Sequence, residues 1–356
     1  MRIKIITIIS VIALLCTSCE RTLDFVAGED GMGNISIGAI VVSGSPVIVY
    51  VNNALAVDKA QLAEYIGMGE DRIRYMQAGE AIDYMSDSYF KQSAVKEAQV
   101  SADINGQTLP LSFDPLINGY TTSYVPKEGD HIVVKVIADG QELRAETVLP
   151  TTPKIEIVKY EVLAGNPYSE LDGFSYQTDT IMRITCRIVK QPERQYYRLR
   201  IRSERNAHNW WHISDSIHYD GYQMQDVFFS DDELFVDKRL TSSFGGWRPF
   251  FSNVFDDSLI GTGGYTFTVD IPKTPEKTYG TVTSTFNQEH GPLPPQVMVE
   301  LQSISPELYH YLKSVELYKL SYTNANTKPV QLYGNVEGGW GILGSLSSFR
   351  VFIPYD

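Results

Sequence analysis

Alternation of hydrophobic and polar residues is the dominant pattern along the chain, and it predicts short β-strands joined by tight turns. Residues 35–42 and 46–51 are β-rich runs on either side of Ser43-Gly44-Ser45, which is a hairpin signal. Further alternating runs flank Asn105-Gly106 and Asp139-Gly140. Both dipeptides favour two-residue hairpin turns. We therefore expect antiparallel β-structure from residue 35 onward.

A proline-containing segment divides the chain into two β-rich blocks. In Val148-Leu149-Pro150-Thr151-Thr152-Pro153, the prolines should stop sheet pairing because they lack a backbone N–H. We predict an N-terminal β-sandwich of immunoglobulin or transthyretin type over residues 35–150. A second β-rich domain is expected over residues 154–356. Its alternating strands cover residues 182–188, 197–201, 265–271 and 297–301.

The second block should also contain a short amphipathic helix. Ser305 can cap its first turn and Pro306 suits that turn. The residues that share one helical face are Leu308, Tyr311, Leu312 and Val315. We expect this helix to cover a face or an open end of the second sheet. Residues 61–85 break the strand pattern and indicate one or two short helices or a structured insertion. The fold class is therefore mainly β.

The N-terminus carries a different pattern. Arg2 and Lys4 precede an apolar run from Ile5 to Leu15, which is too short to span a bilayer and is typical of a secretory signal. Thr17-Ser18-Cys19 follows. This arrangement resembles a bacterial lipoprotein signal at residues 1–18, in which cleavage before Cys19 leaves a thiol that carries diacylglycerol. An ordinary signal peptide with a chance cysteine is the alternative. The polar, Gly-rich residues 19–34 would form a tether.

Charge and cysteine content narrow the class of protein. The formal net charge is −13, and removing residues 1–18 takes away two basic residues and no acidic ones. Such an acidic chain lacks the excess of basic residues with which a nucleic-acid-binding protein contacts phosphates. Charge would not attract it to anionic lipid either, so the lipid on Cys19 would be the anchor. If Cys19 is lipidated, Cys186 has no disulfide partner and is predicted to be a buried small hydrophobe.

One candidate binding segment is rich in aromatic residues. Rings that stack on sugar faces or apolar ligand groups lose little conformational entropy on binding. The alternative for this segment is packing in an aromatic core or hairpin. The residues concerned are Trp210, Trp211, Tyr219 and Tyr222.

A second candidate follows from strand parity. If the strands over 182–188 and 197–201 pair as a hairpin, five arginines share one side of the sheet: Arg183, Arg187, Arg198, Arg200 and Arg202. Such a patch could bind an anionic ligand bidentately. The alternative is internal ion pairing with nearby acidic residues. The acidic partners considered are Asp231, Asp232, Glu233, Asp256 and Asp257.

Metal, cofactor and catalytic signatures are weak. The histidine-rich stretch has no HExxH motif, and a strand would place its histidines too far apart for one ion; it contains His208, His212, Asp215 and His218. Residues 339–344 match the spelling G-x-G-x-x-G, but no βαβ unit can follow, so we expect a turn-rich closing segment. The run Asp231-Asp232-Glu233 lacks EF-hand spacing. We predict no metal, no cofactor and no enzymatic activity. A glycosidase remains an alternative, because its two catalytic carboxylates meet only in the folded structure and leave no sequence motif.

A family resemblance emerges from motifs in a shared order. They are the lipoprotein signal, Ala145-Glu-Thr-Val-Leu-Pro150, Gln195-Tyr-Tyr-Arg-Leu-Arg200, Ser230-Asp-Asp-Glu-Leu-Phe235, the run from Val299 to Leu312, and Asn335-Val-Glu-Gly-Gly-Trp-Gly341. Together these motifs make the chain resemble the Bacteroidetes lipoproteins of the domain-of-unknown-function family numbered 4249. Residues 61–85 and Ile342-Leu343 depart from the family pattern and affect the expected ligand surface more than the fold.

The resemblance implies an outer-membrane lipoprotein, often produced with a TonB-dependent transporter, and it supplies no catalytic residues. We expect a surface-tethered ligand-binding or accessory subunit of a TonB-dependent nutrient transporter. A structural or adhesive cell-surface lipoprotein is the alternative, and a glycan- or peptide-processing enzyme comes third. The outward-facing side of the outer membrane is the expected location, with periplasmic orientation left open.

Overall fold

The computed structural model describes residues 35–53, 93–164, 180–203, 228, 230–241, 249–272, 296–323 and 330–354. The signal, Cys19, the tether and the insertion over residues 61–85 lie outside this part of the chain. The described chain is mainly β with one short α-helix, which confirms the predicted fold class. None of its helices is long and apolar enough to cross a membrane.

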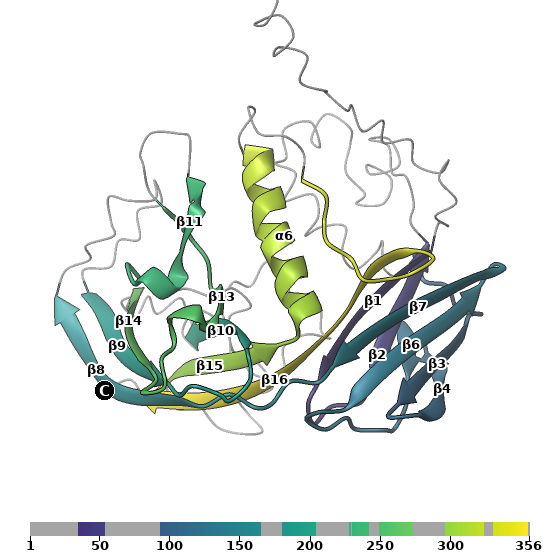
Figure 1. The fold of residues 1–356 in the computed structure, drawn as a ribbon, viewed down its shortest axis with the longest axis horizontal. Coiled ribbons are helices and arrows are strands. Elements are labelled where there is room, and N and C mark those ends of the chain that lie inside the picture. The colour runs from purple at the N-terminus through teal and green to yellow at the C-terminus, as the bar shows by residue number, and fades with distance from the viewer. Residues whose placement is uncertain are drawn as a thin grey trace, which may run out of the picture. The chain divides into compact units, whose positions relative to one another are not determined.

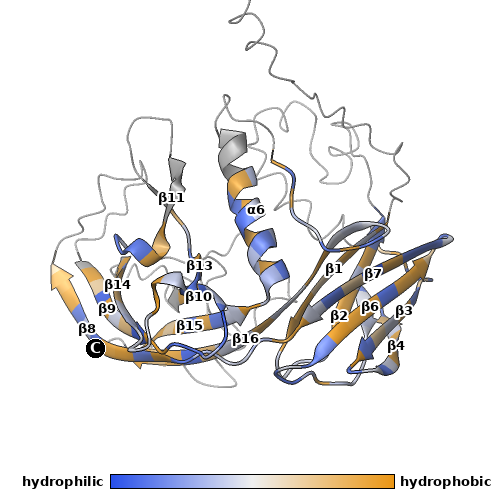
Figure 2. Ribbon diagram, in the orientation of Figure 1, coloured by the Kyte–Doolittle hydropathy of each residue, from blue (hydrophilic) through white to orange (hydrophobic). Residues whose placement is uncertain are grey.

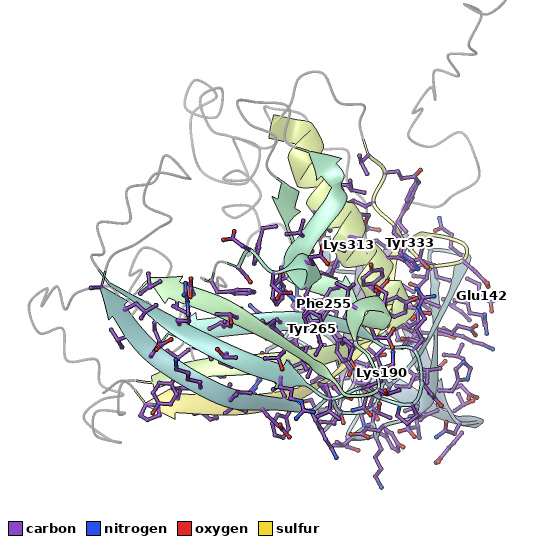
Figure 3. All side chains as sticks on the ribbon, turned by 60° about the vertical axis from the view of Figure 1, so that its left-hand side comes forward. Glu142, Lys190, Phe255, Tyr265, Lys313 and Tyr333 are labelled. Carbon is purple, nitrogen blue, oxygen red and sulfur yellow. The ribbon has the colours of Figure 1, made fainter. Side chains whose placement is uncertain are left out.

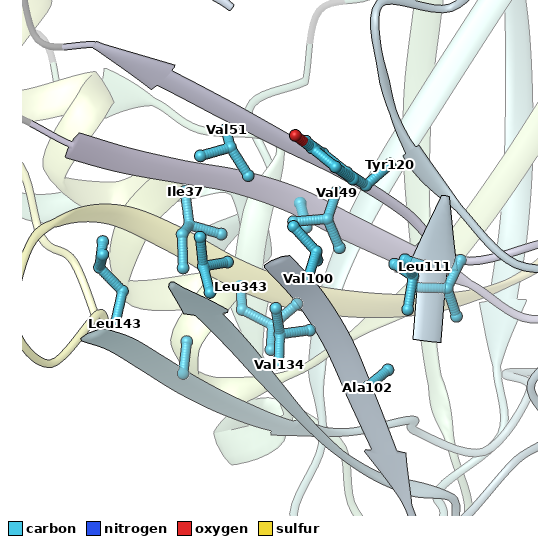
Figure 4. Packing of buried hydrophobic residues seen from close by; sticks show 14 of the residues in the cluster. Ile37, Val49, Val51, Val100, Ala102, Leu111, Tyr120, Val134, Leu143 and Leu343 are labelled. Atoms are coloured by element: carbon cyan, nitrogen blue, oxygen red, sulfur yellow. The ribbon is translucent and has the colours of Figure 1, made fainter. Parts of the chain in front are cut away.

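The first seven strands surround one hydrophobic core. Their hydrogen-bonded order is β1-β2-β5-β4-β3-β6-β7, and every pairing is antiparallel. Figure 4 shows the core side chains, which come from facing strands. The strands are β1 (Ile35–Val42), β2 (Ile48–Asn53), β3 (Gln99–Ile104), β4 (Gln107–Asp114), β5 (Gly119–Thr121), β6 (His131–Ala138) and β7 (Gln141–Val148).

Two tight turns in this sandwich have the backbone conformation that their sequences predict. Asn105 and Gly106 have φ values of 53° and 88°, and Asp139 and Gly140 have values of 49° and 76°. Positive φ at both central residues defines a type I′ turn, whose twist matches that of the flanking strands. The predicted β3–β4 and β6–β7 hairpins are confirmed.

A second core lies between two further layers of strands. One layer has the order β14-β9-β8, and the other contains β13-β10-β15-β16. Apolar and hydrophilic residues alternate along these strands (Figure 2). The strands are β8 (Ile155–Ala164), β9 (Thr180–Ile188), β10 (Tyr196–Ser203), β13 (Val254–Asp256), β14 (Tyr265–Pro272), β15 (Gln296–Ile304) and β16 (Trp340–Pro354). Smaller elements are η3 (Glu233–Phe235), β11 (Val236–Thr241), β12 (Pro249–Phe251) and η4 (Asp257–Leu259).

Strand β16 belongs to both cores, which corrects the predicted domain boundaries. Its first half pairs in parallel with β1, from Trp340 beside Ser36 to Leu346 beside Val42. Its second half pairs antiparallel with β15. Leu343 is fully buried in the first core. The N-terminal sandwich therefore includes residues from the far end of the chain and does not consist of residues 35–150 alone.

The predicted turn-rich closing segment is instead the start of this strand. Gly341 has a φ of 115°, and a Cβ at this position would overlap the carbonyl oxygen of Ile37. A glycine permits both this backbone conformation and this close approach. The glycines therefore allow β16 to lie against β1. They do not form a nucleotide-binding loop.

The predicted helix is present as α6 (Pro306–Thr323). The backbone N–H of Leu308 donates to Ser305 Oγ at 3.3 Å, so Ser305 caps the helix as predicted. Leu308 packs with Val254 of β13 and Ile304 of β15. The helix thus packs against β16, β13 and β10 (Figure 1).

Candidate functional site

The predicted five-arginine patch does not form, because β9 and β10 do not pair. Strand β9 pairs with β8 and β14, whereas β10 pairs with β13 and β15. Ile184 and Leu199 point from these two layers into the shared core. The arginines alternate with these core residues, so those of β9 and those of β10 lie on opposite outer faces of the second sandwich.

Individual arginines have partners other than the predicted acidic residues. Arg183 makes two hydrogen bonds of 2.8 Å to the buried carboxylate of Asp270 on β14. Arg187 donates to the carbonyl oxygen of Gly263 at 2.6 Å. Arg183 is therefore in an internal ion pair, as in the alternative to a ligand-binding patch, with a carboxylate other than those named from the sequence. Arg183 and Arg187 sit on the solvent side of the small sheet, where each is held by the neighbouring strand or turn.

On the other layer, one buried carboxylate lies between two arginine positions. Glu300 is opposite Arg200 of β10 on one side and opposite Arg350 of β16 on the other. Arg350 Nε donates to Glu300 Oε1 at 3.0 Å, and Glu300 is 1% exposed. Arg198 is in register with Gln302, while the side chain of Arg202 lies outside the described part of the chain. Arg350, which is not one of the five arginines of the predicted patch, thus forms an ion pair with a carboxylate that the sequence did not single out.

The acidic clusters serve local structure. Asp232 Oδ1 accepts the backbone N–H of Leu234 at 3.0 Å and the hydroxyl of Tyr265 at 2.9 Å. Burial and this hydrogen bond raise the pKa of Tyr265 to about 12. Asp257 accepts from Lys190 Nζ at 2.7 Å. Within the described ranges, no group of three or more His, Cys, Asp or Glu side chains is arranged to hold a metal ion.

The remaining predicted residues are the aromatic segment, the nearby histidines and Cys186. The aromatic segment with Trp210, Trp211, Tyr219 and Tyr222 lies outside the described residues, as do the nearby histidines, so both remain predictions. Cys186 is fully buried in the second core, and burial raises the pKa of its thiol to about 12. This placement confirms that Cys186 behaves as a small hydrophobe.

A cavity of about 310 Å³ lies between α6 and the segment that contains η3, β13 and η4. Figure 3 labels Lys313 and Phe255, which line it from α6 and β13. Its apolar lining residues include Leu234, Phe235, Val254, Leu259 and Tyr309. Its polar lining residues are Glu233, Ser252, Asp256, Ser258 and Lys313. A small-molecule site usually has apolar walls with a few polar groups, and this cavity is more polar than that.

The polar end of the cavity is a hydrogen-bonded cluster centred on Ser252. The Ser252 side chain is almost fully buried, and its Oγ accepts from Lys313 Nζ at 2.6 Å and from the backbone N–H of Val254 at 3.1 Å. Oγ lies 2.8 Å and 2.9 Å from the two carboxylate oxygens of Glu316, to which it can donate. Lys313 Nζ also donates to Glu316 Oε2 at 3.2 Å. Both charged side chains are more than four-fifths buried.

Two elements position this cluster. Lys313 and Glu316 are three residues apart on α6, so they share a helical face. Ser252 is held in place because its backbone N–H donates to Phe235 O at 2.8 Å and its neighbour Asn253 accepts from the N–H of Leu199 at 2.9 Å. The serine and the two charged side chains come from segments more than sixty residues apart.

Comparison with known proteins places the chain in a family. The model described as Domain of unknown function (DUF4249) matches residues 76–350, which is more than half of the chain. The chain belongs to the DUF4249 family. No curated protein matches the sequence.

Among solved structures, one from Corynebacterium diphtheriae, named provisionally as a membrane anchored protein, is 12% identical with a TM-score of 0.17. The alignment covers 76% of this chain and 54% of that chain, so this chain spans about half the length of the solved one.

Sequence reasoning did not find the cavity of this DUF4249 chain. Ser252 has no motif around it, and Lys313 and Glu316 read as ordinary polar residues of an amphipathic helix. The available signal was the i,i+3 pair of opposite charges on a helix predicted to cover a sheet. That signal is common on solvent-exposed helices, and only the packing of α6 against β13 makes it part of a cavity.

Proposed function

We propose that this chain is a lipid-anchored binding protein of the outer-membrane surface that acts as the ligand-binding or accessory subunit of a TonB-dependent transporter. The anchor is proposed from the N-terminal pattern that ends at Cys19. An acylated cysteine would hold the β-rich body at the membrane without a spanning helix. The β-rich body is that of the described strands, and the transporter partner is part of the proposal.

The observation that carries the binding role is the cavity beneath α6. Its aromatic and aliphatic walls can take the apolar part of a small ligand, and the ammonium of Lys313 and the hydroxyl of Ser252 lie at one end. A ligand with an aromatic or apolar body and an acidic or carbonyl group matches this distribution.

The same geometry favours binding over nucleophilic catalysis. An activated serine needs a lone pair directed at the substrate and a neighbouring base able to take its proton. In Ser252 Oγ, the two lone pairs accept hydrogen bonds from Lys313 and Val254. Lys313 Nζ donates to Ser252 Oγ at 2.6 Å and to Glu316 Oε2 at 3.2 Å, so it serves in this cluster as a hydrogen-bond donor.

The ligand-binding part is tested with anilinonaphthalene sulfonate, an aromatic anion whose fluorescence reports binding. We expect Lys313→Met and Leu259→Ala each to weaken its binding about tenfold, or about 1.4 kcal/mol. Lys135→Met is the matched control, because Lys135 is an exposed residue of β6 away from the cavity. Equal affinity in the Lys313 variant, the Leu259 variant and the control would reject the cavity as the site.

The transporter part is tested by affinity purification of the tagged, membrane-anchored protein in mild detergent. Co-purification of a β-barrel transporter supports the accessory role. A stable preparation without such a transporter counts against it and favours the structural or adhesive alternative.

A further inference from the structure

Strand β8 is an exposed edge of the second sandwich. It pairs with β9 on one side, and no strand in the described part of the chain pairs with its other side. Figure 1 shows β8 as the outermost arrow of its layer. An edge strand presents unpaired backbone N–H and C=O groups and can add a further strand.

The β8 edge is apolar to an unusual degree for a solvent-facing strand. Val158, Tyr160 and Val162 have exposed fractions of 57%, 39% and 47%. Beside them, a groove of about 340 Å³ lies between residues 157–160 of β8 and residues 351–354 of β16, where Phe352 is 48% exposed. Clustered exposed apolar side chains at a strand edge indicate an interaction surface.

The sequence of this edge is complementary to itself about Tyr160. Residues 157–163 read Ile-Val-Lys-Tyr-Glu-Val-Leu. In an antiparallel pairing of two copies centred on Tyr160, Val158 would face Val162 of the other copy. Lys159 would face the other copy's Glu161, and the reverse pair would form as well. Cross-strand apolar pairs and opposite charges each stabilise such a pairing.

The opposite charges of Lys159 and Glu161 therefore indicate that the partner at this edge is a second copy of the chain. We propose that β8 pairs antiparallel with β8 of a second copy of this chain, so that two three-stranded layers join into one continuous sheet. The contact is isologous, as expected for a two-fold dimer. Lys159 and Glu161 already lie 2.9 Å apart within one chain and have side-chain exposures of 61% and 38%. Both are thus accessible and can exchange this internal contact for the contact between copies.

The pairing of β8 with β9 limits the length of this contact. The extra residue lies between Ile157 and Lys159, close to the proposed centre at Tyr160, and the register is continuous only from Lys159 to Ala164. A bulge limits how far the pairing extends. The contact is therefore short, and it buries less area than an extended interface between two whole sheets would.

Charge exchange tests the proposal. Two differently tagged copies of the mature, membrane-anchored protein are co-expressed, and their co-purification is measured. Lys159→Glu in both copies, or Glu161→Lys in both, places like charges opposite each other and should lower co-purification about tenfold or more. One copy with Lys159→Glu and the other with Glu161→Lys restores both opposite-charge pairs, so co-purification should recover.

Recovery in the mixed pair is specific to a second copy, since another partner at this edge would not respond to it. Undiminished co-purification of the like-charged pairs, or no co-purification of the wild-type copies, would overturn the proposal. Thermal unfolding of each variant should match that of the wild type, because both side chains are exposed.

A cross-linking experiment gives an independent readout. Tyr160→Cys places one thiol on the two-fold axis, so mild oxidation should give a disulfide-linked dimer. Ile137→Cys on β6 is the matched control, because Ile137 is a similarly exposed strand residue with a fraction of 47%. If the Tyr160→Cys variant cross-links no faster than this control, the two-fold pairing is rejected. Neither experiment uses a ligand or a transporter, so the outcome is separate from that of the proposed function.

Discussion

The hydroxyl oxygens of Thr147 and Ser345 lie 3.0 Å apart although 198 residues separate them in the sequence. Thr147 is on β7 and Ser345 is near the middle of β16, and both are buried. Ser345 Oγ also donates to Val148 O at 2.7 Å, and its backbone N–H donates to the helix cap Ser305 at 3.3 Å. This buried polar contact joins the first sandwich to the start of α6.

Removing one partner of this contact should destabilise the protein. Thr147→Val keeps the side-chain shape but deletes its hydroxyl, so we expect the free energy of unfolding to fall by about 1–2 kcal/mol. Urea unfolding followed by circular dichroism measures the change. Thr108→Val is the control, because the Thr108 hydroxyl bonds to the carboxylate of Asp103 at an exposed position. A shift there as large as that of the Thr147 variant would contradict the interpretation.

Gly341 should not tolerate a side chain. In Gly341→Ala, the new Cβ would overlap Ile37 O and the residue would have to keep a φ of 115°. We expect a loss of more than about 3 kcal/mol, or failure to fold, because both strain and steric overlap act. Gly38→Ala on β1 is the matched control, because nothing lies within 4 Å of its Cβ position. Its unfolding midpoint should stay close to that of the wild type.

Alkaline pH should weaken the fold through Tyr265. Its pKa is raised from 10.0 to about 12 in the folded state, so between these values the folded chain keeps a proton that the unfolded chain has lost. Stability contributed by this group is therefore complete below pH 10 and decreases as the pH rises toward 12. Tyr265→Phe should reduce the slope of stability against pH in this window, as urea unfolding at several pH values would show. An unchanged slope would mean that the Asp232 contact does not control this ionisation.

Membrane attachment should depend on Cys19. Cys19→Ala removes the proposed acylation site, so the protein should move from the carbonate-washed membrane fraction to the soluble fraction, as immunoblotting of both fractions would show. Cys186→Ala serves as the control, because Cys186 is buried in the second core and distant in sequence from the signal. Retention of the Cys19 variant in washed membranes would show that another feature anchors the chain.

Local patterns in the sequence were sufficient for most individual elements. Alternation located β3, β4, β6, β7 and β14, the Asn105-Gly106 and Asp139-Gly140 dipeptides located their turns, and Ser305-Pro306 located the start of α6. These features depend on residues within a few positions of each other. Side-chain parity and positive φ are properties of the local backbone, and the sequence therefore carries them directly.

Pairing between distant strands was decided by the tertiary structure. The sequence could show that β9 and β10 alternate, but a connection containing Pro192 can either form a hairpin or cross between layers. The chain crosses, which separates Arg183 from Arg200. The assignment of β16 to both cores and the approach of Lys313 to Ser252 have the same origin. Each depends on contacts between segments far apart in the chain, whose energies are set by how whole layers pack, and no local pattern encodes that packing.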